Sequence, residues 1–151
     1  MADLVEKQIR DKLVTALTGL ATTKKNVFPY RKYPVDDRLP ALLIYTDDEL
    51  ITIDTMDTLG QDSRAKLHAL DVRIEVHAKQ SDTVEDTIAK IYKEVIIALE
   101  ADPTLGGLIK DLMNTGNTKE NVNDGDQPAI AGVMTWEAQY RTREGVPDAT
   151  I

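Results

Sequence analysis

Few side chains in this 151-residue sequence have the types and spacing that catalysis or cofactor binding requires. It contains no cysteine, which excludes thiolate catalysis, disulfides and iron–sulfur clusters. Its two serines lie outside any nucleophile-elbow motif, and no glycine-rich phosphate-binding loop occurs. The two histidines, His68 and His77, occupy polar positions of a strand-like segment, so we interpret them as exposed strand residues. We therefore expect no enzyme activity and no cofactor.

One group of carboxylates in the middle of the sequence could bind a hard cation. Its members are Asp47, Asp48, Glu49, Asp54 and Asp57. A small metal-dependent hydrolase built on Asp47, Asp54 and Asp57 is an alternative function, although the group lacks a positioned histidine. A second acidic segment, residues 120–126, does not have the ligand spacing of a calcium-binding loop. We expect solvated acidic segments and no metal site.

An aromatic and basic segment stands out in this mostly acidic sequence, inside a long region without periodicity (residues 21–39). It consists of Tyr30, Arg31, Lys32 and Tyr33. Tyrosine and arginine are enriched at the energetic centres of protein interfaces, so we interpret the segment as a contact surface for another protein. A plain solvent-exposed loop is the open alternative.

The charges are separated along the sequence. Eighteen basic against 26 acidic residues give a net charge of −8, which excludes broad attachment to nucleic acid. Residues 1–40 carry eight basic and five acidic side chains, whereas residues 41–63 carry six acidic and no basic ones. Such opposed surfaces suit a head-to-tail contact between identical subunits. A surface dipole without a partner is the alternative.

The hydrophobic periodicity predicts one α+β domain over residues 1–151, with helices packed on one face of a four-stranded, mainly antiparallel sheet. Helices are expected at residues 3–20, at 82–101, and in a short segment that begins near Pro103 and ends near Gly116. Strands are expected at residues 40–46, 50–56, 64–79 and 130–142. The pattern of the third strand changes phase at Ala69–Leu70, which predicts a β-bulge there. We expect a polar loop at residues 114–127, a flexible tail at 145–151, and neither a signal peptide nor a membrane span.

The ordered succession of these segments resembles the tail terminator family of long-tailed bacteriophages. The resemblance covers almost the whole sequence. It rests on Tyr33-Pro34, residues 39–46, the alternating residues 70–76, the helix ending near Leu99, Asp102-Pro103-Thr104-Leu105 with Leu108-Ile109, and residues 132–142. Each motif is weak by itself, and the specificity lies in their order.

The resemblance implies a virion protein that forms a homo-hexameric ring at the head-proximal end of the tail. Such a ring caps the major tail tube protein, stops its polymerisation, and then provides the surface to which the head-completion (neck) protein joins. It implies assembly in the bacterial host cytoplasm, no catalysis, and a lumen through which DNA passes without being held. An acidic lining would repel phosphate, so residues 47–62 or residues 120–126 are the candidates for it. Another neck component, such as a head–tail joining or tail-completion protein, is the alternative in the same class.

Overall fold

The computed structural model describes residues 2–29, 39–53, 64–79, 82–124 and 127–151, of which 120–124 and 127–131 are described by backbone alone. These residues form two helices and six strands. The elements are α1 (Val5–Leu17), β1 (Val27–Phe28), β2 (Ala41–Ile53), β3 (Ala65–Lys79), α2 (Val84–Glu100), β4 (Asp111–Asp124), β5 (Gln127–Arg143) and β6 (Val146–Thr150). Neither helix combines the length and apolar character that crossing a membrane requires.

All six strands belong to one mixed sheet with the order β1-β2-β3-β5-β4, and β6 pairs with β5 beyond the end of β4. Every pairing is antiparallel except that of β1 with β2. The expected four-stranded sheet is therefore wrong, because the strands expected at residues 40–46 and 50–56 form the single strand β2, and β1, β4 and β6 were not expected. The two short strands, β1 and β6, are too brief to show a period of two, so the sequence pattern did not reveal them. The segment expected to be a loose tail ends in β6, and Gln8 Nε2 donates a hydrogen bond to the carbonyl of Asp148 at 2.9 Å.

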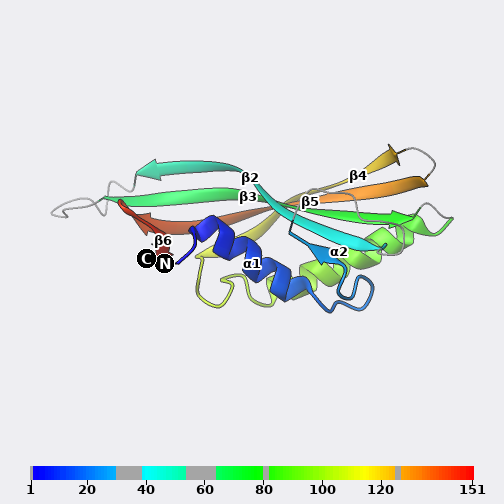
Figure 1. The fold of residues 1–151 in the computed structure, drawn as a ribbon, viewed down its shortest axis with the longest axis horizontal. Helices are drawn as coiled ribbons and strands as arrows, with labels where there is room; N and C mark the ends of the chain where they lie inside the picture. Colours follow the sequence, from blue (N-terminus) through cyan, green and yellow to red (C-terminus); the bar gives the residue numbers. More distant parts are fainter. Residues whose placement is uncertain (1, 30–38, 54–63, 80–81, 125–126) are drawn as a thin grey trace.

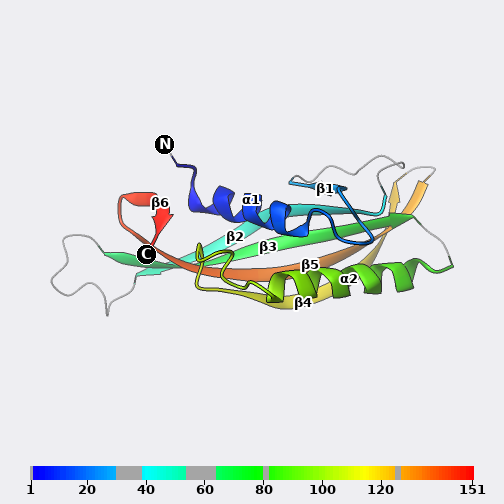
Figure 2. The same ribbon diagram turned by 90° about the horizontal axis from the view of Figure 1, so that it is seen from below.

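Both helices lie side by side on the same face of the sheet (Figures 1 and 2). Each contributes an apolar stripe at helical spacing, as the sequence predicts. The stripes are Val5, Ile9, Leu13 and Leu17 in α1, and Val84, Ile88, Ile91, Val95 and Leu99 in α2. They pack on the alternating residues Leu70, Val72, Ile74 and Val76 of β3 and on Trp136 of β5, which is completely buried. The other face of the sheet, here called the open face, carries no helix of the described residues.

The helix expected near Pro103 is not formed. Residues 101–110 make a turn, and the chain then continues as β4, so most of the expected polar loop at 114–127 is strand. Three consecutive residues, Leu105, Gly106 and Gly107, have φ values of 50°, 71° and 89°, which no right-handed helix accommodates. Leu105 is nevertheless buried in the core. The apolar spacing of this segment therefore predicted correctly that Leu105 is buried, but the helix that it also predicted is absent.

The β-bulge lies in β2 and not in β3. The pairing of β3 with β5 is continuous from Ala65↔Arg143 to Lys79↔Ala129. The pairing of β2 with β3 shifts between Thr46 and Glu49, so that Asp47 and Asp48 together face the single residue between Leu70 and Val72. The phase change seen in the sequence arises because Leu67 and Ala69 belong to the open face. The bulge turns Glu49 from the open face to the face that carries the helices.

The sheet is longer than the helical layer at one end. Near the two chain termini, β2 and β3 extend past the start of α1 (Figure 1). We call this extension the β2–β3 arm; it comprises residues 49–53 and 65–69. Because α1 begins only at Val5, no described helix covers the arm.

Candidate functional site

Four polar side chains from three strands meet where the β2–β3 arm begins. This polar cluster consists of Glu49 from β2, His68 from β3, and Tyr140 and Thr142 from β5. His68 Nδ1 lies 2.8 Å from Glu49 Oε1, and His68 Nε2 lies 2.8 Å from Thr142 Oγ1. The Tyr140 hydroxyl donates to the same Glu49 oxygen. The pairing of β3 with β5 brings these side chains together, since it places His68 directly opposite Tyr140.

The hydrogen-bond roles in the polar cluster follow from the chemistry of its members. A carboxylate only accepts, so Nδ1 of His68 donates to Glu49, and Nε2 is hydrogen-bonded to the Thr142 hydroxyl. Burial, reinforced by the bond to Glu49 and the charges of Glu49 and Glu6, raises the pKa of Tyr140 far above its ordinary value. Tyr140 therefore stays neutral and donates at any physiological pH.

The chain Thr142–His68–Glu49 has the connectivity of a hydrolase triad, in which a hydroxyl, an imidazole and a carboxylate are linked in series. Thr142 is only 3% exposed, and its hydroxyl is bound to His68. The Glu49 oxygen is also shared with Tyr140, so the carboxylate is held by two strands at once. This geometry favours a structural cross-link between β2, β3 and β5.

A recess of about 270 Å³ opens directly above the polar cluster. Leu4, Ile51 and Pro147 form its apolar walls, and Lys66 and Arg143 add positive charge. We call it the terminal recess, because residues near both chain termini, Leu4 and Pro147, line it. Ile51 is 48% exposed, so the rim presents uncovered apolar surface next to two cations.

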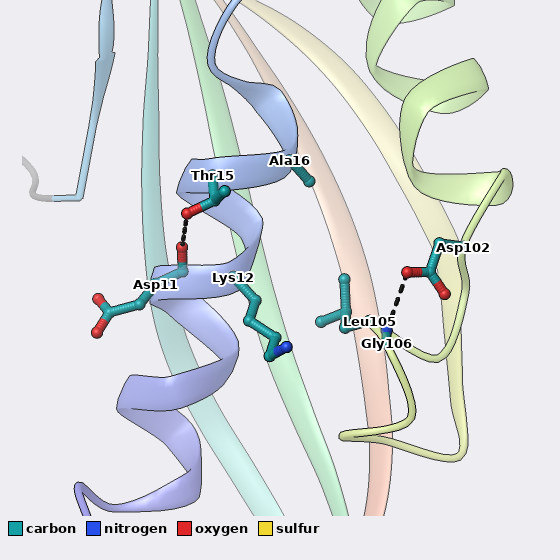
Figure 3. Close-up of a pocket in the computed structure, with 7 residues that line it drawn as sticks. All are labelled: Asp11, Lys12, Thr15, Ala16, Asp102, Leu105 and Gly106. Atoms are coloured by element: carbon teal, nitrogen blue, oxygen red, sulfur yellow. Dashed lines mark hydrogen bonds between the residues drawn. The ribbon is translucent and has the colours of Figure 1, made fainter.

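A second recess, of about 390 Å³, lies between α1 and the turn that follows α2 (Figure 3). Lys12 points toward this turn, and its Nζ would lie 3.4 Å from a Cβ placed on Gly106. The Asp102 carboxylate accepts the backbone N–H of Gly106 at 2.9 Å, and the Thr15 hydroxyl donates to the carbonyl of Asp11. Its polar groups are thus engaged locally and do not converge on a common point.

The structure separates the acidic residues that the sequence groups together. Asp47, Asp48 and Glu49 lie within β2 and not in a loop. Asp47 pairs with Arg73 on the open face at 2.8 Å, and Asp48 lies in a recess of that face, whereas Glu49 points into the polar cluster. Asp54 and Asp57 lie outside the described residues, as does the segment Tyr30, Arg31, Lys32 and Tyr33. The roles assigned to these residues stay predictions.

The open face near the bulge is acidic. Asp48, Asp71 and Glu137 line one recess there, around the side chains of Leu50 and Ala69. Asp71 and Glu137 are direct cross-strand partners, although their charges repel. Within the part of the chain that the structure describes, no three histidine and carboxylate side chains are arranged to hold a metal ion.

The sequence pattern suggested that the two histidines are exposed strand residues, and the structure shows that this is wrong. His77 is only 2% exposed and contacts Glu75 Oε2 at 3.1 Å, and His68 belongs to the polar cluster. Sequence reasoning missed the cluster because it placed a bulge at Ala69. With β3 continuous, His68 has the same parity as Leu70 and therefore lies on the helix-covered face.

Comparison with known proteins does not identify a family. No family model matches the chain, and no curated protein is similar to it. One solved structure is described as "Virion of native gene transfer agent (GTA) particle", and its matched chain is 14% identical, with a TM-score of 0.36, over 90% of this chain and 92% of that chain. A likeness of this size supports no inference about function. The tail terminator family therefore stays a resemblance carried by the sequence.

Proposed function

We propose that this protein is a structural subunit of a phage or prophage virion, which forms a hexameric ring on the head-proximal end of the tail. The ring would cap the tail tube, stop its polymerisation and offer the surface to which the head joins. The observation that carries the proposal is the β2–β3 arm. Leu50, Ile51, Ile53 and Leu67 are all exposed there, on both faces of this end of the sheet. Apolar side chains on a part of the sheet that no described helix covers suit a contact with another subunit.

The charge of the open face supports the lumen that the proposal requires. Asp48, Asp71 and Glu137 lie together there, and Asp47 nearby is neutralised by Arg73. A wall with this excess of carboxylates repels the phosphates of passing DNA and provides few cations that could retain it. We therefore assign the acidic lining to the open face near the bulge. Glu49 borders the same recess, but its carboxylate is bound by His68 and Tyr140 in the polar cluster, so we do not assign its charge to this lining.

The partners of the proposed ring are further copies of this chain, the major tail tube protein below it and a neck protein above it. The proposed role needs no catalysis and no cofactor. The proposed location is the virion, after assembly in the host cytoplasm. A gene for a major tail protein next to the gene for this chain would support the assignment.

Native mass spectrometry and negative-stain imaging of the purified protein, with and without tubes assembled from that neighbouring tail protein, test the proposal. We expect a concentration-dependent hexamer, rings at one end of the tubes, and tubes that stop growing. Cross-linking to the tube protein would support the terminator role. Cross-linking to portal-side proteins alone would favour another neck component, and a monomer even beside tubes would contradict both.

A further inference from the structure

We propose that the C-terminal end of α2 of one copy seats in the terminal recess of a neighbouring copy. The inference rests on the proposed ring and names the two surfaces that hold it together. One surface is the terminal recess, walled by Leu4, Ile51 and Pro147. The other is the α2 knob, which we define as Ile97 and Glu100 at the end of α2.

The terminal recess lies on the helix-covered face of the sheet, beyond the start of α1, with the polar cluster as its floor and apolar side chains in its walls. The alternation that buries Leu70 continues along β3 through His68 to Lys66, on the face that carries the helices. Over Leu70 this face is buried, whereas over Ile51 it opens to solvent because α1 has not yet begun. An apolar side chain inserted here would extend the existing core.

The terminal recess also carries positive charge. Lys66 and Arg143 lie at its rim, and Lys66 makes no ion pair with any described residue. The carboxylate of Glu49 below is already bound by His68 and Tyr140. A suitable occupant is therefore apolar at its centre and negative at its edge.

The α2 knob has these two properties. Ile97 is 60% exposed, because it lies on the side of α2 opposite the buried residues Val95 and Leu99. Glu100 is exposed at the end of the helix, and the last turn contains no basic residue. The helix dipole adds a partial negative charge at this end, which no basic side chain of the last turn offsets. Ile97 thus matches the apolar walls, and Glu100 matches Lys66.

A second copy of the chain is the occupant that these features select. The recess and the knob are different surfaces, so a contact between them is head-to-tail and repeats around a closed ring. Within one chain the contact is not made, since Ile97 is exposed and lines no part of the recess. Both surfaces are thereby available in every subunit for its two neighbours.

Charge exchange across the contact provides the first test. Lys66→Glu and Glu100→Lys should each raise the concentration of half-assembly about tenfold, since like charges would then meet at every interface. The double variant should restore assembly to near the wild-type value. Its matched control pairs Lys66→Glu with Glu85→Lys, an exposed carboxylate in the first turn of α2, and should restore nothing. Native mass spectrometry measures the hexamer fraction, and circular dichroism checks that each variant is folded.

Disulfide capture provides the second test, because the chain has no cysteine of its own. Ile51→Cys combined with Ile97→Cys should give, under mild oxidation, a covalent ladder that reaches the hexamer on non-reducing gels. Either single variant can give dimers at most. Hexamers that show neither ladder nor charge rescue would overturn this contact and leave the proposed ring standing. A wild-type chain that stays monomeric beside tail tubes would instead remove the proposed function, and the contact with it.

Discussion

The imidazole of His68 stacks on the ring of Tyr140, with centroids 4.3 Å apart and planes within 8° of each other. The stack joins β3 to β5, and the bonds from His68 to Glu49 and Thr142 add β2 to the same cross-link. The polar cluster thus fastens the sheet at the point where the helical layer ends. Such a fastening would keep the β2–β3 arm in a fixed position for assembly.

Substitution of His68 measures the contribution of this cross-link. His68→Phe retains an aromatic ring for the stack but removes both hydrogen bonds of the imidazole. We expect the free energy of unfolding to fall by about 1–3 kcal/mol, because the substitution leaves buried polar groups without a partner. Urea denaturation followed by circular dichroism measures the change. Thr142→Val is the matched control and should cost about 1 kcal/mol, since it removes a single bond; an unchanged stability in His68→Phe would show that the cluster does not fasten the sheet.

Alkaline pH should weaken the fold through Tyr140. Because the pKa of Tyr140 is raised in the folded protein, the folded state keeps a proton that the unfolded state releases above about pH 10. The unfolded state then binds fewer protons, so stability is complete below this pH and falls by up to about 1.4 kcal/mol per pH unit above it. Tyr140→Phe should flatten the slope of the unfolding free energy between pH 9 and pH 11.

A matched variant separates this effect from other tyrosines. Burial also raises the pKa of Tyr92, so Tyr92→Phe should remove a smaller part of the same slope. If Tyr140→Phe keeps the full alkaline slope, Tyr140 is not held neutral by the polar cluster.

The sequence predicted the elements that have a strong period and failed where the period is weak. The spacing of Ile9 and Leu13 in α1, and of Ile88 and Ile91 in α2, follows directly from burial of one helical face, and both helices are found. The edge strand β4 escaped prediction because its exposed, mostly polar residues show no alternation. β4 is a strand because it pairs with β5, and this pairing cannot be seen in the sequence of β4.

The polar cluster could not be predicted, because it depends on register. Glu49 reaches His68 only through a bulge in β2, whose location no local pattern reported. Tyr140 and Thr142 come from a strand more than seventy residues away in sequence. A shift of one residue in any of these pairings would move a member to the open face.

A glycine in β5 makes room for the side chain that attaches α2 to the sheet. The Tyr92 hydroxyl donates to the carbonyl of Thr118 at 2.6 Å, and a Cβ on Gly132 would lie 2.1 Å from that hydroxyl oxygen. Gly132→Ala should therefore displace Tyr92 and lower the free energy of unfolding by about 1–3 kcal/mol. Tyr92→Leu should cost less in the Gly132→Ala background than in the wild type. Additive costs in this double-mutant cycle, measured by urea denaturation, would contradict a direct clash.

The Asp71–Glu137 pair offers a test in which stability and the proposed function move in opposite directions. The two carboxylates are direct cross-strand partners, so their repulsion lowers the stability of the fold. A role for the acidic surface in the assembled ring would explain why both carboxylates are present. Glu137→Lys replaces the repulsion with an attraction and should raise the free energy of unfolding by about 0.2–1 kcal/mol.

If the open face lines the lumen, the same change places six new cations along the path of DNA in the proposed hexamer. Rings of the variant should then bind short duplex DNA at low salt and release it as salt rises. Fluorescence anisotropy of labelled DNA at several salt concentrations measures this, and Glu144→Lys serves as a control for an equal change of charge elsewhere in the chain. A more stable Glu137→Lys ring that binds no more DNA than the control would show that the open face does not line the lumen.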